Sequence, residues 1–150
     1  MKKVIFVAIM MVFITGSVNA AEGILNIESQ FSVKKTADRL EKILNKKGLT
    51  IFNRINHSKN AEKFGIQFNK TELIIFGNPK AGGPLMKCQQ TIAIDLPLKA
   101  LIWEDENKKV WISYNDMNYL EKRHGIKNCG KSISSIAKKL INITTSAANQ

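Results

Sequence analysis

The chain has 150 residues, a length typical of a single domain with one hydrophobic core. Its 23 basic and 12 acidic side chains give a net charge of +11 at pH 7. The lysines are scattered and there are only three arginines (Arg39, Arg54 and Arg123), whereas nucleic-acid modules interleave arginines and aromatic residues with their lysines. A solvated lysine-rich surface is therefore expected, and nucleic acid is not an expected partner.

The first 20 residues have the pattern of a cleaved secretory signal peptide. Lys2 and Lys3 precede an apolar run from Val4 to about Ile14, and Val18 and Ala20 occupy the −3 and −1 positions of the cleavage site. The alternative is an uncleaved anchor, but the run is shorter than the ~18 to 20 residues that span a bilayer. We expect a periplasmic or secreted mature domain, residues 21–150, with a charge of +9 and no stable membrane span.

The mature part begins with a predicted edge strand over residues 24–30, and Ser32 follows in the position of a helix N-cap. Gly48 stands where a left-handed residue commonly ends a helix. Between them, apolar residues recur at helical spacing: Val33, Ala37, Leu40 and Leu44. This pattern predicts an amphipathic helix.

Residues 49–57 alternate imperfectly and predict a strand. The alternation assigns Leu49, Ile51 and Asn53 to one face, and Phe52, Arg54 and Asn56 to the other. A short helix is expected from about Ser58 to Phe64, ending at Gly65, and the β-branched and aromatic run over 71–77 predicts a buried strand.

Asn78 and Pro79 end that strand, and Ala81-Gly82-Gly83 is read as a turn. Pro84 suits the first position of a helix over 85–90. A short segment over 91–94 then leads to a strand over 98–104.

The clearest hairpin in the chain spans Ala100 to Tyr114. Asn115 or Asp116 caps a helix that runs to about His124, and a last amphipathic helix covers residues 132–143 before a polar tail. We predict an α+β fold, with an antiparallel sheet of about five strands and helices packed mainly on one face.

Cys88 and Cys129 both remain after cleavage. Two cysteines in an oxidising compartment can form a disulfide, although sequence alone does not show that they meet. Two free thiols or a thiol-based site are the alternatives. No CxxC motif is present, which excludes a thioredoxin-like redox motif.

Polar residues stand at the ends of three predicted strands: His57, then Glu104 with Asp105, then Asn115 with Asp116. A histidine beside a carboxylate can exchange protons or hold a metal, so His57 and Glu104 form one candidate acid/base pair. A hydrogen-bonded structural histidine and a helix N-cap explain the same residues without chemistry.

The glycine-rich segment over 76–86 offers backbone amides to an anion, but it matches neither a Walker A loop nor GxGxxG, so a tight turn is the simpler interpretation. Met86 with His57 or His124 can supply axial ligands to a haem, although the chain has no CxxCH motif. The cofactor therefore stays open between none, haem and a metal.

Several blocks together resemble the family called domain of unknown function 302. The blocks follow in the same order from about Ser32 to His124: Arg54-Ile-Asn-His57 with Ala61, Thr71 to Pro79, Gly83-Pro-Leu-Met86, Ile94 to Leu98, Trp103-Glu-Asp105, and Tyr114-Asn-Asp116. The resemblance implies a compact α+β domain with an antiparallel sheet, found in bacterial and archaeal proteins and often exported. It brings no established reaction.

Two positions depart from the family pattern. Asn56 replaces the Asp that usually precedes the histidine, and Gly83 stands directly before Pro84 in place of a Gly-Thr-Pro order. An amide cannot accept a proton or stabilise imidazolium as a carboxylate does, so catalysis at His57 is weakened. A binding role survives this change better.

The first hypothesis is therefore an exported, non-catalytic domain that binds a small ligand. Its candidate site residues are His57, Asn78, Met86, Glu104 and Tyr114, with no metal assigned. A haem- or metal-binding redox protein and a small acid/base enzyme are the alternatives. An exposed sheet edge also makes a homodimer a candidate assembly.

Overall fold

The computed structural model describes residues 21–149. The expected signal peptide over residues 1–20 lies outside this range. The elements follow along the chain as β1 (Ile24–Ser29), α1 (Val33–Lys46), β2 (Thr50–Asn56), α2 (His57–Glu62), β3 (Thr71–Gly77), α3 (Pro79–Cys88), the 3₁₀ turn η1 (Gln90–Ile94), β4 (Leu98–Glu104), β5 (Val110–Asn115), α4 (Met117–His124) and α5 (Gly130–Asn149).

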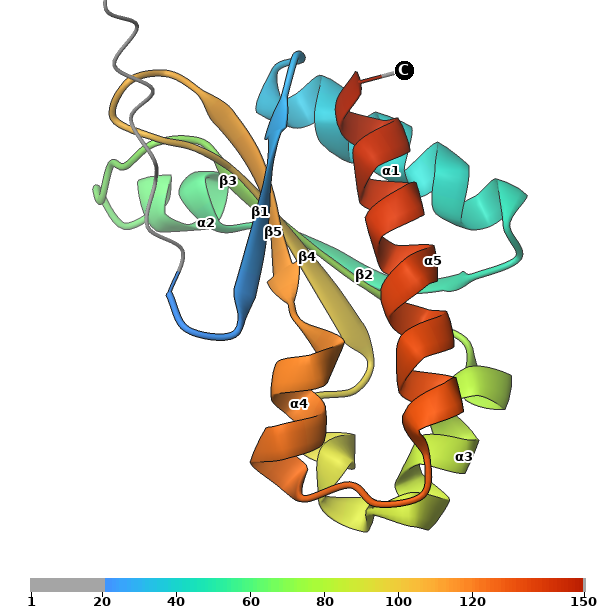
Figure 1. Ribbon diagram of the computed structural model, residues 1–150. Helices are drawn as coiled ribbons and strands as arrows, with labels where there is room; N and C mark the ends of the chain where they lie inside the picture. The colour runs from blue at the N-terminus through green and yellow to red at the C-terminus, as the bar shows by residue number, and fades with distance from the viewer. Residues whose placement is uncertain (1–20, 150) are drawn as a thin grey trace, which may run out of the picture.

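The five strands form one sheet in the order β1-β5-β4-β3-β2, and every neighbouring pair is antiparallel. The long helices α1 and α5 lie side by side on the same side of this sheet (Figure 1). The short helix α2 lies away from them, next to β3. The predicted α+β class, with helices mainly on one face, is confirmed.

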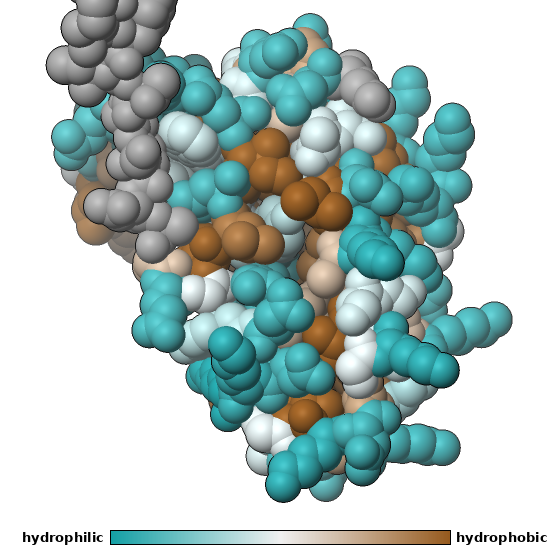
Figure 2. All heavy atoms as spheres, viewed as in Figure 1, coloured by the Kyte–Doolittle hydropathy of each residue, from teal (hydrophilic) through white to brown (hydrophobic). Residues whose placement is uncertain are grey.

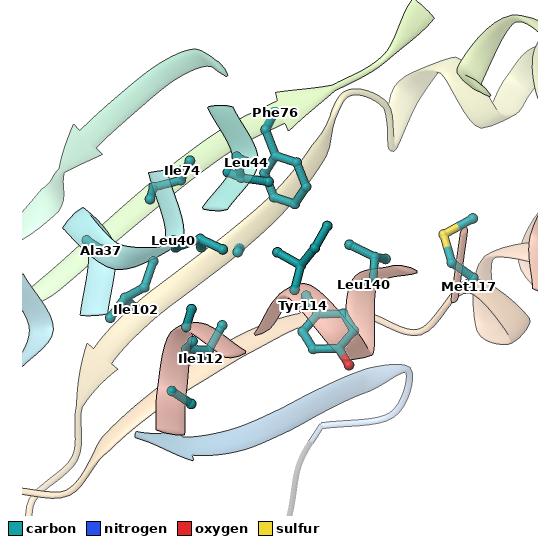
Figure 3. Packing of buried hydrophobic residues seen from close by; sticks show 14 of the residues in the cluster. Ala37, Leu40, Leu44, Ile74, Phe76, Ile102, Ile112, Tyr114, Met117 and Leu140 are labelled. Atoms are coloured by element: carbon teal, nitrogen blue, oxygen red, sulfur yellow. The ribbon is translucent and has the colours of Figure 1, made fainter. Parts of the chain in front are cut away.

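Helix α1 forms where its sequence pattern predicted it. The Ser32 side chain accepts a hydrogen bond from the Lys35 amide, and Gly48 after the helix has a φ of +68°. Leu40 and Leu44 on the predicted stripe are fully buried. Figure 3 shows them pointing toward Ile74 and neighbouring core residues on the strands. Each such buried leucine stabilises the fold by roughly 1.5–3 kcal/mol relative to an exposed one.

Strand β2 contains a β-bulge that the alternating pattern did not predict. Ile51 pairs with Phe76, Asn53 pairs with Ile75, and the residue between them, Phe52, is extra. A bulge shifts the side-chain alternation by one residue. Ile51 and Arg54 therefore stand opposite Phe76 and Ile74 on the same, helix-covered face, and the prediction that they lie on opposite faces is wrong.

The predicted hairpin is confirmed, with β4 and β5 in a register that pairs Ala100 with Tyr114. Its loop is held by Asp105, whose side chain accepts hydrogen bonds from the backbone amides of Asn107 and Lys109 and from Trp111 Nε1. The first expected strand also forms, and β1 is an edge strand as predicted.

Helix α3 begins at Pro79, six residues before the predicted range of 85–90. Pro79 occupies its first turn, and the Asn78 side chain accepts a hydrogen bond from the Lys80 amide at 2.9 Å. Gly82 donates to the Asn78 carbonyl at 3.0 Å, so Ala81-Gly82-Gly83 is helical and is not the predicted turn. Pro84 lies inside the helix. The local N-cap outweighed the glycines and the second proline.

Helix α5 is longer than the predicted range of 132–143, and the expected polar tail is part of it. Ala147 and Ala148 are fully buried. Arg39 on α1 donates to the carbonyls of Ser146 and Ala147, and the Gln30 amide donates to the carbonyl of Ala148. Tertiary contacts therefore satisfy the last turn, which has no local stop signal.

Coverage of the sheet is incomplete at its β1 edge. Figure 2 shows apolar side chains along the seam between β1 and α5, with hydrophilic side chains on either side. Leu25 of β1 remains 41% exposed. This edge presents unpaired backbone groups, which is the basis of the homodimer expected from the sequence.

Candidate functional site

An apolar groove of about 580 Å³ lies at the end of the sheet where β3 leads into α3. Its walls come from the end of α1, β2, the β3–α3 junction, the η1–β4 connection and α5. The lining residues are Lys47, Leu49, Phe52, Phe76, Gly77, Asn78, Pro79, Ala81, Gly82, Met86, Ala93, Leu96, Pro97, Leu98, Ile136, Lys139, Leu140, Asn142 and Ile143. Ligand sites of small molecules commonly have this size and apolar character.

Two glycines, Gly77 and Gly82, line the groove, and a Cβ at either would make only ordinary van der Waals contact. A Cβ at Gly77 would lie 3.6 Å from both the Phe52 ring and Pro97, and a Cβ at Gly82 would lie 3.5 Å from Leu96. A Cβ at the neighbouring Gly83 would meet nothing within 4 Å. The Gly82 side of α3 therefore faces the groove, and the Gly83 side does not.

The bulge in β2 supplies the aromatic wall. Phe52 is the extra residue of the bulge, and its side chain lines the groove while remaining 52% exposed. Bulges commonly redirect a side chain at the rim of a sheet. An apolar ring left half in water at a concave surface is suited to contact with a ligand.

Helix α5 forms the opposite wall. Ile136, Leu140 and Ile143 recur at helical spacing and line the groove, and Lys139 and Asn142 stand beside this stripe. Lys47, which follows α1, is the second cation. The lining contains no aspartate, glutamate, histidine or cysteine, so the described residues provide no acid/base pair there.

A second, polar cleft lies at the other end of β2 and β3. We call Arg54, Glu72, Asp38, Glu41 and Asn56 the Arg54 cluster. Arg54 donates from Nε to Glu72 at 2.7 Å and from Nη1 to Asp38 and Glu41 at 2.7 and 2.8 Å. Asn56 Nδ2 donates to the other oxygen of Glu72 at 3.1 Å. The buried carboxylate of Glu72 is thus held through both oxygens.

The pKa shifts of the cluster follow from these contacts. Burial opposes the charge of Arg54, but hydrogen bonds to Asp38, Glu72 and Glu41 outweigh it and raise the Arg54 pKa. Hydrogen bonds from Lys34 and Arg54 lower the pKa of Asp38. The charges of the cluster are therefore directed at one another, which indicates a structural role.

The predicted site residues separate into two groups. Asn78 and Met86 line the apolar groove, whereas His57, Glu104 and Tyr114 do not. His57 is exposed at the first residue of α2, and Glu104 accepts from Lys108 at 3.1 Å. No hydrogen bond joins His57 to Glu104 within residues 21–149 of the structure.

Tyr114 belongs to the core between β5 and α5, where Figure 3 shows its ring beside Leu140. Burial raises the pKa of its hydroxyl, which therefore stays protonated. Thr144 on α5 lies close to it but donates to the carbonyls of Leu140 and Ile141. Within the described part of the chain the Tyr114 hydroxyl has no partner that meets hydrogen-bond geometry.

His124, the other histidine, ties α4 to η1. Its Nε2 lies 2.6 Å from Asp95 Oδ2, and its Nδ1 lies 3.1 Å from Thr91 Oγ1. Both ring nitrogens thus have protein partners. Among residues 21–149 there is no group of three or more His, Cys, Asp and Glu side chains arranged to hold a metal ion.

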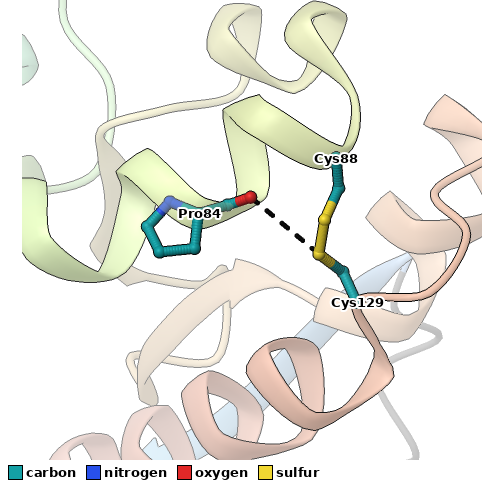
Figure 4. The surroundings of a disulfide bond; sticks show 3 residues. All are labelled: Pro84, Cys88 and Cys129. Carbon is teal, nitrogen blue, oxygen red and sulfur yellow. Dashed lines mark hydrogen bonds between the residues drawn. A yellow bond between two sulfur atoms is a disulfide. The ribbon is translucent and has the colours of Figure 1, made fainter.

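The structure joins Cys88 and Cys129 as a disulfide, with their Cα atoms 6.5 Å apart (Figure 4). Cys88 is the last residue of α3, and Cys129 directly precedes α5. The bond therefore links two walls of the groove. Cys129 Sγ lies 3.9 Å from the Pro84 carbonyl oxygen, inside α3.

Known proteins that are similar in sequence to this chain are longer than the region that matches it. Residues of the chain are 41% identical, over 104 residues, to proteins named fluoride-specific ion channel from Brucella suis and Brucella abortus. The match covers 69% of this chain and only 41% and 38% of those relatives. The chain thus spans about two fifths of their length, and within its described part no helix is long and apolar enough to cross a membrane.

The fold has a counterpart among solved structures. The crystal structure of an uncharacterized conserved protein DUF302 from Bacillus stearothermophilus superposes with a TM-score of 0.76, covering 85% of this chain and 99% of that one. The two sequences are 16% identical, so this likeness concerns the fold alone. The sequence pattern of one family matches residues 25–147, and the chain therefore belongs to the family described as Domain of unknown function DUF302.

Proposed function

We propose that this protein is an exported, non-catalytic binding domain that holds a small apolar ligand in the groove beside α3. The observation that carries the proposal is the groove itself, about 580 Å³ with walls that are almost entirely apolar. Water in such a space gains few hydrogen bonds, so an apolar molecule that displaces it binds favourably.

A binding role suits the lining better than catalysis does. Acid/base and nucleophilic mechanisms need titratable groups near the reacting atoms. Lysines are the one titratable type in the lining, and Asn78 uses its side chain to cap α3. The amide at position 56, which caps α2, also favours binding over catalysis near His57.

Export is supported by the signal-peptide pattern at the start of the chain and by the cysteine pair, since disulfides persist in oxidising compartments. Fractionation of the native host with N-terminal sequencing of the mature protein tests this part. A chain that begins at Ala21 outside the cytoplasm is the expected result, and an intact Met1 terminus in the cytoplasm would contradict it.

The groove is tested by filling it from α3. Gly82→Phe places a ring in the groove, whereas Gly83→Phe adds the same ring to the same helix at a position with free space around it. We expect the mature protein to bind the neutral fluorescent probe Nile red. Gly82→Phe should weaken this binding at least tenfold and Gly83→Phe should leave it within about twofold, because one removes groove volume and the other does not.

Circular dichroism of both variants checks that the fold is retained. No saturable binding by the wild-type protein, or equal loss in the two variants, would contradict the proposal. The haem or metal alternative and the His57–Glu104 acid/base alternative stay predictions. An as-purified visible spectrum with metal analysis tests the former.

A further inference from the structure

All the charged side chains that line the groove are positive. Lys47 and Lys139 line it, both are exposed, and no acidic side chain accompanies them. Long lysine side chains lay their methylene stems along apolar surface and keep the ammonium group in water. Here, the two stems extend an apolar wall and the two charges mark the place where the groove meets solvent.

Three lysines elsewhere in the molecule have ion-pair partners. Lys34, Lys108 and Lys109 form ion pairs with Asp38, Glu104 and Glu28 at 2.7 to 3.2 Å. Neither Lys47 nor Lys139 forms an ion pair with any residue in the part of the chain that the structure describes. Their charge is available to a ligand.

The groove combines an apolar space with two lysine charges where it meets solvent. A ligand that fits both features has an apolar chain and a negatively charged group. We propose that the occupant of the groove is a free single-chain amphiphile with an anionic head group, such as a carboxylate. Its chain lies between Phe52 and the Ile136–Leu140 stripe, and its head group binds Lys47 and Lys139. This inference depends on the proposed function, since it names the ligand class of the same groove.

The test compares two probes of equal chain length, dodecanoate and dodecan-1-ol, by displacement of Nile red below the micelle concentration. They share a twelve-carbon chain and differ in the head group, which is an anionic carboxylate in one and a neutral alcohol in the other. Charge-assisted hydrogen bonds to this exposed lysine pair should favour dodecanoate about tenfold. Higher salt should reduce this preference, because exposed charges are screened.

The variants exploit neighbouring lysines. Lys47→Gln with Lys139→Gln removes the two groove charges, and Lys46→Gln with Lys138→Gln removes two charges one residue away, outside the lining. The first pair should abolish the preference for dodecanoate, because dodecanoate loses the two cations that would bind its head group. The control pair should keep the preference, which separates local contact from the effect of net charge.

Equal affinity of the wild-type protein for both probes, or equal effects of the two double variants, would overturn the head-group assignment while the groove function stands. If neither probe binds, or if Gly82→Phe binds both normally, the groove function itself fails. Sedimentation with vesicles that contain anionic phospholipid tests the other source of this chemistry. Lysine-dependent capture on vesicles without dodecanoate binding would replace the free ligand by a membrane surface.

Discussion

The Arg54 cluster and the apolar groove lie at opposite ends of β2 and β3. They differ in whether their charged side chains have ion-pair partners. In the cluster, Arg54 is surrounded by three carboxylates that use its donors, and the buried Glu72 has partners for both oxygens. At the groove, Lys47 and Lys139 have no ion-pair partner among the described residues. A polar cleft with satisfied charges stabilises the fold, whereas an apolar space with unsatisfied charges is suited to a ligand.

The largest expected effect concerns the covalent link beside the groove. Cys88→Ser with Cys129→Ser opens a loop with a sequence separation of 41 residues. In the chain-entropy model, its loss lowers the free energy of unfolding by about 4 kcal/mol. Urea denaturation measures this, and a reducing agent should bring the wild-type protein to the same value. An unchanged midpoint in the double variant would show that the bond does not stabilise this fold.

The second largest expected effect comes from a substitution in the Arg54 cluster. Arg54→Met leaves Glu72 buried without its cation and Asp38 and Glu41 without theirs. Removing one partner of a buried pair should lower the free energy of unfolding by about 3 kcal/mol. Nile red binding by the folded variant should be unchanged, because Arg54 does not line the groove.

Lys34→Met is the matched control for Arg54→Met, since it removes an exposed cation from the same Asp38. Its cost should stay within ~0.5 kcal/mol, as for surface ion pairs. Equal losses in the two variants, or loss of probe binding in Arg54→Met, would erase the distinction between the two regions.

The smallest effect is a pH dependence. The lowered pKa of Asp38 means that the folded state holds its carboxylate ionised more readily than the unfolded chain does. This contribution is present above the ordinary pKa of 3.8 and is lost as pH falls through the lower folded value. Asp38→Asn should therefore reduce stability at neutral pH and flatten its decline in acid. Glu106→Gln, at a residue without an ion pair in the described range, is the control, and identical acid profiles for the wild type and Asp38→Asn would contradict the assignment.

Local signals explain which parts of the fold were predictable. Helices α1 and α4 begin and end at residues that act within a few positions of the chain: Ser32, Gly48, Asp116 and Gly125. The β4–β5 hairpin likewise has a short loop. The sequence therefore predicted α1, α4 and the hairpin. The start of α3 differs from the prediction because Asn78 caps a helix whose sequence contains two glycines and two prolines.

The groove was only partly predictable, because it is assembled from distant segments. Asn78 and Met86 were selected from one unusual local block, but Phe52 reaches the groove through a bulge, and Lys139 belongs to a helix far along the chain. The nearest sequence signal was the imperfect alternation around Phe52. His57 and Glu104 are predicted only from their positions at strand ends. Strands β2 and β4 both end at the edge of the sheet away from the groove, so this criterion selects the wrong edge.

The most direct test asks which end of the sheet responds to a ligand. Backbone amide signals of the ¹⁵N-labelled mature protein are followed by NMR during titration with dodecanoate. We predict saturable shifts concentrated at the groove, at Phe52, Gly82 and Ile136, with the amides of Arg54 and Glu72 unaffected. Shifts concentrated in the Arg54 cluster, or no saturable shift with either dodecanoate or dodecan-1-ol, would contradict the assignment of the groove as the binding site.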